Sequence, residues 1–214
     1  MNSTPRHFTR QGFTLVGLLI IIAVLGILAA MLIPALVSAK GKSKRIQCVS
    51  NLKQDGLAFR LWEGDNGDKY PMAVSTNKNG TMEYAADVFR HFQVMSNELS
   101  TPKILVCPAD NRTAAASFAR LENQNVSYFV GLAATEVRPP MLLTGDRNVT
   151  NGLSPVRSVL ELRPEIPAGW TEDMHNGQGN VGLADGSVQQ VSIPGLLQIL
   201  KNTGDSTNRI ALPE

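Results

Sequence analysis

Two different patterns of hydrophobic residues follow each other near the start of this 214-residue chain. Residues 13–37 are 25 consecutive positions without a charged side chain. A helix of that length extends about 38 Å, whereas the hydrocarbon core of a bilayer is about 30 Å thick. The run is also too long for the apolar part of a secretory signal, which has about 7 to 15 residues. It therefore predicts a helix that spans a membrane.

The next 25 residues, 38–62, have the pattern of an amphipathic helix. Apolar residues and one glycine recur there at steps of three and four, at Ile46, Val49, Leu52, Gly56 and Phe59, and the stripe widens at Leu57, Leu61 and Trp62. The opposite side carries Lys44, Arg45, Gln47, Asn51, Lys53 and Asp55. We expect this part of the helix to bury its apolar stripe against a globular domain.

The remaining chain predicts shorter elements of both kinds. A second helix is expected over residues 82–99, where Tyr84, Val88, Phe92, Met95 and Leu99 share one face. Strands are expected at 104–106, 126–132 and 141–144, a short helix at 113–121, a loop at 145–152, a helix or strand at 193–200, and a polar tail after it. This mixture predicts an α+β fold.

A β-hairpin is predicted near the C-terminus. Asp185 and Gly186 lie between two strand-like runs, 180–184 and 187–191. Asp-Gly in this position is typical of a two-residue type I′ turn, which needs positive φ at both central residues. His175 lies just before the first of these strands, so the segment reads as histidine, nine residues, and Asp-Gly.

Candidate chemistry is sparse. His175 lies near Asp173 and Asp185, which is compatible with a metal site, an acid–base pair, or hydrogen bonds that tie a loop to the hairpin. His91 is expected at the surface of the second helix. The turn after residue 62 is rich in oxygen ligands, so that calcium binding and a solvated turn both stay open, with Glu63, Asp65, Asn66 and Asp68 as its polar residues.

Composition excludes several classes of function. The formal net charge is only +2, so bulk charge indicates no nucleic-acid partner. No glycine-rich phosphate loop follows a strand, and no serine or cysteine has the context of a catalytic nucleophile. We therefore expect neither an enzyme nor a bound cofactor.

At the N-terminal junction a basic leader is followed by Gly12, Phe13, Thr14 and Leu15 and then by the long apolar run. This arrangement resembles the prepilin signal of type IV pilins and type II secretion pseudopilins. In this family a membrane peptidase cuts after the glycine and methylates the new N-terminal residue. The resemblance implies cleavage between Gly12 and Phe13, a leader of residues 1–12, a transmembrane and assembly helix of residues 13–37, and an exported head of residues 38–214.

Four positions in the helix bear on assembly. Gly17 stands where the family has a glutamate that pairs with the amine of a neighbouring subunit, so that a minor, tip-located role is plausible. Gly26 and Ala30 form a small-xxx-small pair that lets another helix approach, although lipid also tolerates small residues. Pro34 is expected to kink the helix.

A second resemblance covers nearly the whole chain. A bacterial subgroup of prepilin-like proteins combines the N-terminal signal with the pattern His-x9-Asp-Gly. Its members also have an Asn-Leu-Lys-Gln stretch after a first cysteine and Cys-Pro-x-Asp at a second. The corresponding residues here are Cys48, 51–54, 107–110, His175 and Asp185-Gly186. The resemblance implies a pilin-like fold, in which one long helix packs on a small antiparallel sheet with short helices.

The resemblance also bears on the cysteines. An exported domain lies in an oxidising compartment, where Cys48 and Cys107 can form a disulfide that closes a loop of about 60 residues. Two unpaired buried thiols are the alternative. Their spacing is too wide for a zinc motif, and the chain has no further cysteine to complete one.

These resemblances imply a structural subunit of a type II secretion pseudopilus or a type IV pilus-like filament. Its partners would be prepilin peptidase, other pilin or pseudopilin subunits and the inner-membrane assembly machinery. The expected location is the inner membrane, with one span and an exported C-terminal domain. Basic residues on both sides of the span leave the orientation to the resemblance. A membrane-anchored binding module that does not polymerise is the alternative, and an exported hydrolase has little support.

Overall fold

The fold is known from a computed structural model that describes residues 15–214. The predicted cleavage site, Gly12 and Phe13, lies outside the described residues. The chain divides into two compact units, Met1–Lys40 and Gly41–Glu214. The second unit contains every described element except the first part of one helix.

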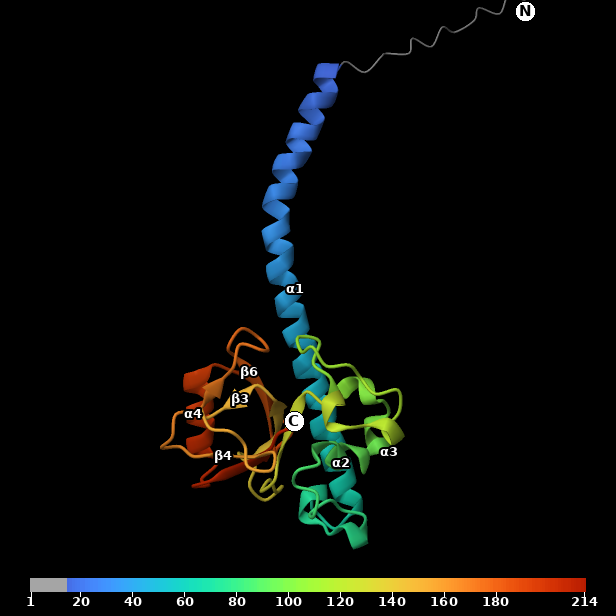
Figure 1. The fold of residues 1–214 in the computed structure, drawn as a ribbon, viewed down its shortest axis with the longest axis vertical. Helices are drawn as coiled ribbons and strands as arrows, with labels where there is room; N and C mark the ends of the chain where they lie inside the picture. Colours follow the sequence, from blue (N-terminus) through green and yellow to red (C-terminus); the bar gives the residue numbers. More distant parts are fainter. Residues whose placement is uncertain (1–14) are drawn as a thin grey trace, which may run out of the picture. The chain divides into compact units, whose positions relative to one another are not determined.

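Helix α1 (Leu15–Asp65) is one continuous helix of 51 residues (Figure 1). It confirms the predicted long helix and ends three residues later than the pattern indicated. Within the first unit its large apolar side chains are exposed, and its most apolar 18-residue window is 0% buried with a mean hydropathy of 3.1. By length and composition alone, this helix can cross a membrane.

The second part of α1 buries one side in the head. Its buried positions follow helical spacing and are Cys48, Asn51, Leu52, Asp55, Gly56, Ala58, Phe59, Trp62 and Glu63. The prediction was right for Leu52, Gly56, Phe59 and Trp62. It was wrong for Ile46, Leu57 and Leu61, which are 64%, 57% and 52% exposed. It was also wrong for Asn51 and Asp55, which were expected on the polar side and are buried. The buried stripe is centred on Cys48, Leu52, Asp55, Phe59 and Trp62, so it includes polar groups that the apolar pattern skipped.

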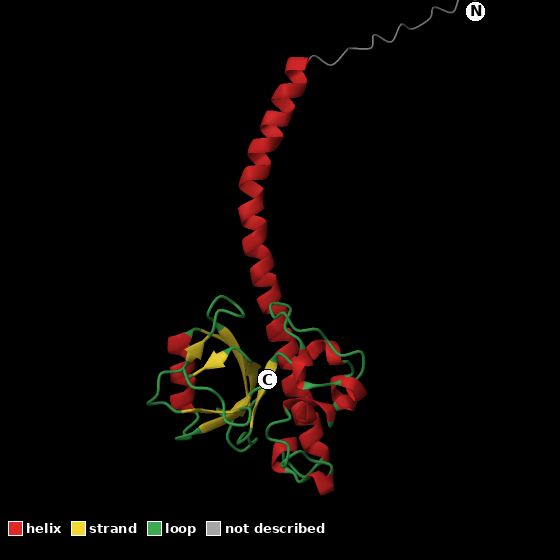
Figure 2. Ribbon diagram, in the orientation of Figure 1, coloured by secondary structure: helices red, strands yellow, loops and turns green. Residues whose placement is uncertain are grey.

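In this unit, short helices cover the side of α1 that faces away from the β-sheet (Figure 2). The predicted helix over residues 82–99 is two helices, α2 (Val88–Gln93) and α3 (Ser96–Leu99). Its apolar face is confirmed for Val88, Phe92, Met95 and Leu99, which are at most 3% exposed, but not for Tyr84, which precedes α2 and is 37% exposed. Five turns of 3-10 helix complete this side: η1 (Pro71–Ala73), η2 (Thr76–Lys78), η3 (Pro102–Leu105), η4 (Phe118–Arg120) and η5 (Asn123–Asn125).

Two of these turns correct the predictions. The expected strand at 104–106 is mostly η3, because Pro102 lies in its first turn and the hydroxyl of Thr101 accepts a hydrogen bond from the backbone amide of Lys103. The expected helix at 113–121 is reduced to η4. His91, expected at the surface of α2, is 0% exposed.

The main sheet has six strands in the order β4-β8-β1-β2-β6-β7, and every neighbouring pair is antiparallel. The strands are β1 (Tyr128–Gly131), β2 (Leu142–Asp146), β4 (Val159–Leu162), β6 (Gly179–Leu183), β7 (Val188–Val191) and β8 (Asn208–Ala211). A second, two-stranded sheet pairs β3 (Val149–Thr150) with β5 (Gly169–Trp170). Helix α4 (Ile193–Asn202) follows the hairpin.

The predicted strands β1 and β2 and the hairpin β6–β7 are confirmed, and residues 193–200 are helical. Two other expectations were wrong. Part of the loop expected at 145–152 belongs to β2 and β3. The polar tail contains β8, which lies inside the sheet because it pairs with β1 on one side and β4 on the other.

The sheet separates two hydrophobic cores, because successive residues of a strand point to opposite faces. Tyr128, Val130 and Leu143 belong to the core that includes α1 and α2. Phe129 and Leu142 belong to the core on the other face, which α4 covers. One long helix on a small antiparallel sheet with short helices is the α+β, pilin-like fold that the sequence predicted.

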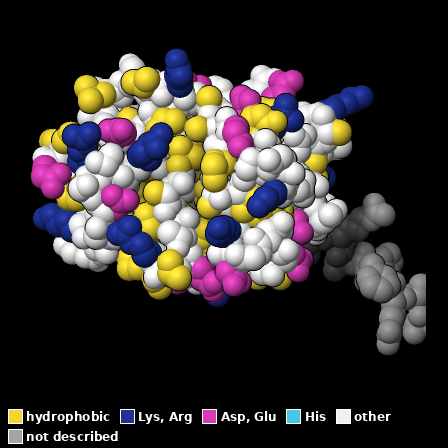
Figure 3. All heavy atoms as spheres, turned by 90° about the horizontal axis from the view of Figure 1, so that it is seen from below, with side chains coloured by type: hydrophobic (Ala, Val, Ile, Leu, Met, Phe, Trp, Pro, Cys, Tyr) yellow, Lys and Arg dark blue, Asp and Glu magenta, His cyan; other side chains and the backbone are white. Residues whose placement is uncertain are grey.

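The surface of the head is mixed in charge. On the face seen in Figure 3, basic and acidic side chains alternate between apolar patches. Apolar side chains with high exposure include Val137 (87%) and Val156 (75%).

Candidate functional site

Four reactive side chains meet inside the head. Cys48 comes from α1, Cys107 from the segment after η3, Asp146 from the end of β2, and His175 from the loop before β6. One ligand atom from each side chain can be chosen so that all four lie within 4.8 Å of one another. We refer to these four residues as the thiol–carboxylate–imidazole cluster.

The shortest contacts link the cluster in a chain. The Sγ atom of Cys48 lies 3.1 Å from Oδ1 of Asp146, to which it donates a hydrogen bond. Nε2 of His175 lies 3.3 Å from Oδ2 of Asp146 and 3.3 Å from Sγ of Cys107. The hydroxyl oxygen of Tyr128 is 3.4 Å from Sγ of Cys48. Each member therefore touches at least one other member through a polar atom.

Burial sets the electrostatics of the cluster. The side chains of Asp146 and His175 are 0% and 2% exposed. Burial raises the pKa of Asp146 to about 7 and also raises the pKa of the Cys48 thiol. The hydrogen bond with Cys48 lowers the pKa of Cys107 against the effect of burial. For His175, burial opposes the charged form, but the hydrogen bond with Cys107 and the charge of Asp146 outweigh it and raise the pKa.

Cys107 is held in place from two sides. The side-chain amide of Asn51, one turn after Cys48 on α1, donates to the backbone oxygen of Val106 over 3.1 Å. The carboxylate of Asp110, which is 1% exposed, forms a bidentate ion pair with Arg147, with both N···O distances 2.8 Å. Arg147 directly follows the ligand candidate Asp146, so this pair fixes the loop of Cys107 against the end of β2.

Asp146 is oriented by residues of β6. Its Oδ2 atom accepts hydrogen bonds from the backbone amide and the side-chain amide of Asn180, at 2.7 and 2.8 Å. The guanidinium of Arg45 donates to Oδ1 of Asn180 over 3.4 Å and to the backbone oxygen of Gly179 over 3.2 Å. Arg45 also donates to Oε1 of Gln178. A positive charge thus lies just outside the buried carboxylate.

The loop that carries His175 has an unusual backbone. Three consecutive residues, His175, Asn176 and Gly177, have φ angles of +53°, +54° and +67°. Left-handed conformation costs the two non-glycine residues free energy, of order 1 kcal/mol each or more. The side-chain amide nitrogen of Asn148 lies 2.9 to 3.1 Å from the backbone oxygens of Thr171, Met174 and Gln178, and so holds the loop on both sides of the histidine.

The Asp-Gly end of the motif docks the hairpin on α1. The backbone oxygen of Asp185 accepts a hydrogen bond from Arg60 over 3.0 Å. The hydroxyl of Tyr70 donates to the backbone oxygen of Ala184 over 2.9 Å. A Cβ atom added at Gly56 would lie 3.8 Å from the Cα atom of Gly186, so the turn passes close to the helix backbone.

The hairpin turn differs from the predicted type. Leu183 donates to the backbone oxygen of Ser187, and Gly186 donates to the oxygen of Leu183, both over 2.9 Å. Gly186 has a φ angle of +83°, whereas Asp185 is not among the residues with positive φ. The loop therefore has three residues and ends in a left-handed glycine, because a type I turn with this glycine also matches the twist of the strands.

The nine-residue spacing of the motif has a geometric reason. Strand β6 extends about 13 Å, and the eight residue-to-residue steps from Cys48 to Gly56 extend about 12 Å along α1. The strand therefore reaches from the cluster at one end to the Asp-Gly turn at the other. The turn, docked beside Gly56, sets the position of β6, and β6 sets the positions of Asn180 and His175.

Comparison with known proteins gives partial matches. A protein named type II secretion system core protein G, from Pectobacterium carotovorum subsp. carotovorum, is 33% identical over 64 residues, which are 30% of this chain and 40% of that protein. A protein of the same name from Klebsiella michiganensis is 33% identical over 66 residues, which are 31% of this chain and 46% of that protein. The match thus spans less than half the length of either relative.

These matches support a pseudopilin-like family for this chain. They do so at the level of the family, not of individual motifs. No protein-family model matches the chain, and no solved structure matches it.

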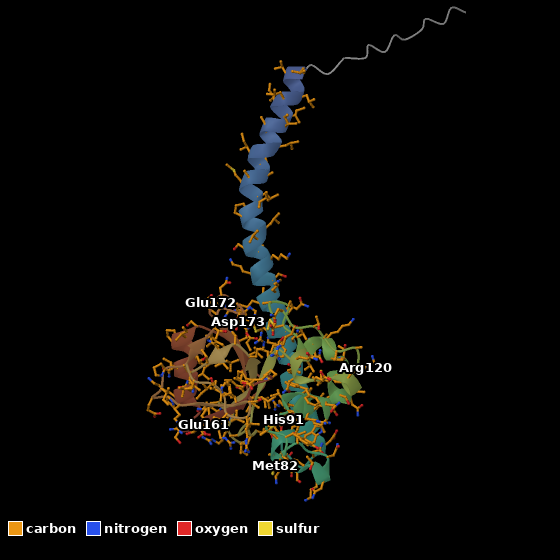
Figure 4. The ribbon with its side chains drawn as sticks, viewed as in Figure 1. Met82, His91, Arg120, Glu161, Glu172 and Asp173 are labelled. Carbon is orange, nitrogen blue, oxygen red and sulfur yellow. The ribbon has the colours of Figure 1, made fainter. Side chains whose placement is uncertain are left out.

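The structure brings together only some of the residues singled out in the sequence. His175 is in the cluster, but Asp173 and Asp185 are exposed and lie elsewhere (Asp173 is labelled in Figure 4). A carboxylate oxygen of Asp173 accepts from the hydroxyl of Thr171, and one of Asp185 accepts from the amide of Ser187. Both aspartates therefore stabilise turns.

Cys48 and Cys107 are neighbours, as a pairing requires, but both are free thiols in this structure. The predicted disulfide is therefore not confirmed. The two cysteines match the alternative of buried thiols in position, yet they are not isolated, because Asp146 and His175 share their site.

The sequence did not identify three residues of the site, Asp146, Asn180 and Arg45. Asp146 follows a short apolar strand, and the only available signal was its position at a strand end.

The candidate assembly residues Gly17, Gly26, Ala30 and Pro34 lie in the first unit, where a Cβ atom at Gly26 would meet nothing within 4 Å. Of the described residues, those of the acidic turn at 63–68 form no group of three potential metal ligands.

Proposed function

We propose that this chain is a structural subunit of a type II secretion pseudopilus or a type IV pilus-like filament. The observation that carries the proposal is α1, whose first part exposes an uncharged apolar surface and whose second part belongs to the core of a pilin-like head. The similarity to two proteins named type II secretion system core protein G supports it.

The exposed part of α1 needs a nonpolar environment. Burying one large aliphatic side chain stabilises by about 1.5 to 3 kcal/mol, and most residues between Leu15 and Val37 are large and aliphatic. Water is therefore an unfavourable environment for this segment. Lipid can cover it before assembly, and helices of other subunits can cover it afterwards.

The proposal includes the maturation steps implied by the resemblance. Prepilin peptidase would cut between Gly12 and Phe13 and methylate Phe13. The subunit would remain in the inner membrane with one span and an exported head until the assembly machinery extracts it. Gly17 lacks the carboxylate that the family uses in docking, which favours a minor position in the filament.

Crosslinking along α1 tests assembly. Single cysteines would be introduced at exposed positions of the apolar segment, for example Leu18→Cys and Leu25→Cys, in cells that contain the secretion system. The two native thiols are buried and should not react. Because each variant has one reactive thiol, we expect covalent dimers with a membrane-permeable thiol crosslinker. Lys201→Cys, at an exposed site on α4, is the matched control for random encounters.

Monomers alone at every position of α1 would contradict the filament and favour the membrane-anchored binding module. Mass spectrometry of the mature N-terminus tests the maturation pathway independently. A methylated Phe13 is expected, whereas a retained Met1 or another cleavage site would remove the main argument for a prepilin.

A further inference from the structure

We propose that the thiol–carboxylate–imidazole cluster binds one zinc ion with tetrahedral coordination and thereby locks the head. This inference goes beyond the filament function and holds whether or not the subunit polymerises. It rests on the geometry, the donor types and the surroundings of the four side chains.

The spacing of the ligand atoms suits a single small metal ion. Zinc bonds of about 2.3 Å to sulfur and about 2.0 to 2.2 Å to nitrogen and oxygen place tetrahedral ligand atoms about 3.3 to 3.8 Å apart. With Oδ1 of Asp146 as its ligand atom, this oxygen lies 3.1 Å from Sγ of Cys48, and Nε2 of His175 lies 3.3 Å from Sγ of Cys107. One ligand atom from each of the four residues can be chosen so that all lie within 4.8 Å of one another. The bound of 4.8 Å is about 1 Å above the tetrahedral range, so side-chain shifts of up to about that size would admit the ion.

The donor set selects the metal. Two thiolates and an imidazole are poor ligands for calcium or magnesium, which prefer oxygen. A carboxylate is a poor ligand for copper(I), which prefers sulfur donors. Zinc accepts all three donor types and imposes no geometry of its own beyond four-fold coordination. All four positions would be filled by the protein, which is typical of a structural zinc site rather than a catalytic one.

Residues around the four ligands orient the carboxylate and balance the charge of the site. Oδ2 of Asp146 already accepts two hydrogen bonds from Asn180, which leaves Oδ1 to face the ion. Zinc with two thiolates and one carboxylate has a net charge of −1. The guanidinium of Arg45, bound to the other side of Asn180, supplies a compensating positive charge. Such outer contacts orient ligands and tune affinity in known metal sites.

A disulfide explains less of this arrangement. It would involve only the two sulfur atoms and would not account for the buried carboxylate and histidine that lie beside them. A zinc ion connects four segments of different origin, which are α1, the 107–110 loop, β2 and the loop before β6. It also gives a reason for holding His175 in a left-handed conformation, because metal bonds can offset that cost.

The test uses the full chain, purified in detergent under reducing conditions without chelators and then equilibrated with a small excess of zinc. Elemental analysis after gel filtration should give one zinc per chain. Thiol counting in denaturant with a strong chelator should show two reduced thiols per chain, which excludes a disulfide in the zinc-loaded protein. Replacing zinc with cobalt(II) should give the visible bands of tetrahedral coordination and a thiolate charge-transfer band.

Conservative ligand variants assign the site. His175→Gln and Asp146→Asn should each lower zinc affinity at least tenfold. Removing a residue that only hydrogen-bonds to a ligand already lowers metal affinity by that factor. The matched control is His91→Gln, which changes a buried histidine of the same head outside the cluster. Circular dichroism confirms that each variant keeps its helix content. The cobalt spectrum of the unaltered chain provides a readout that does not depend on a variant folding.

Two results would overturn the proposal. One is a reduced chain that binds no zinc, or that binds cobalt without a thiolate band. The other is a chain isolated without reductant from its native compartment that contains a Cys48–Cys107 disulfide and no zinc. That second result would leave the filament function untouched, since it concerns only the head.

Discussion

The side-chain amide of Asn51 donates a hydrogen bond to the backbone oxygen of Val106, with an N···O distance of 3.1 Å. Asn51 is three residues after Cys48 on α1, and Val106 directly precedes Cys107. This hydrogen bond therefore links the two segments that bring the cysteines together. This contact gives a structural reason for asparagine at the start of the Asn-Leu-Lys-Gln stretch.

Asn51→Ala should destabilise the head by about 1 kcal/mol, because the oxygen of Val106 loses its partner in a partly buried place. The free energy of unfolding from urea titration measures the effect. Gln54→Ala is the control within the same stretch, because Gln54 is exposed and donates only to Ser50 of its own helix. Equal effects of the two substitutions would show that the contact with Val106 contributes nothing.

Asp55 is the reverse case, a carboxylate that the fold does not satisfy. Its side chain is 0% exposed, and neither oxygen has a hydrogen-bond partner within the described residues. Burial raises its pKa well above the usual value of 3.8. The stability that its neutral form provides is therefore complete below pH 3.8 and is lost as the pH rises through the pKa of the folded state.

We expect Asp55→Asn to stabilise the head by at least about 1 kcal/mol at pH 8, because the amide cannot ionise. The gain should shrink as the pH approaches 4. Denaturation midpoints at both pH values check this, with Asp65→Asn at the exposed end of α1 as the control. A loss of stability at pH 8 would mean that the carboxylate has a partner that the substitution removes.

Gly56 and Gly186 should respond differently to alanine although they face each other. Gly56 is helical, and an added Cβ atom would make an ordinary 3.8 Å contact, so Gly56→Ala should stabilise by up to about 1 kcal/mol. Gly186 has a φ of +83°, so Gly186→Ala should cost about 1 kcal/mol or more. Thermal unfolding of the two variants checks the opposite signs. A stabilising alanine at Gly186 would show that the turn can relax.

Local patterns predicted those parts of the fold whose evidence is local. The long helix, the β6–β7 hairpin and the apolar face of α2 and α3 all follow from spacing within one segment. The burial of Asn51 and Asp55 could not be predicted in this way, because it depends on which face of α1 meets the sheet. Strand β8 has few apolar residues and forms because β1 and β4 pair with it on both sides.

For the same reason, the sequence indicated only part of the candidate site. Cys48, Cys107 and His175 stood out as residue types, but 127 positions separate the first from the last. Asp146 ends a short strand and carries no motif of its own. The four side chains meet only when the hairpin docks on α1. The spacing rules for zinc motifs describe neighbours along the chain, so they do not detect a group of potential ligands that forms in this way.

His91 makes the stability of the head depend on acidity. It is buried, its Nδ1 atom lies 2.7 Å from the hydroxyl of Thr81, and its Nε2 atom has no partner within the described residues. Burial lowers its pKa from 6.5 to about 4. The unfolded chain takes up a proton near pH 6.5, whereas the folded chain does so only near pH 4, so acidification between these values favours unfolding.

The stability that neutral His91 provides is complete above pH 6.5 and is lost as the pH falls toward 4, by about 3 kcal/mol in total. His91→Gln can keep a hydrogen bond to Thr81 and cannot titrate. Urea titrations of both proteins from about pH 7.5 to about pH 4.5 measure the difference in their free energies of unfolding. That difference should shift in favour of the variant as the pH falls, and most of the shift should occur below pH 6.5. Parallel curves over the whole range would show that His91 keeps an ordinary pKa in the folded head.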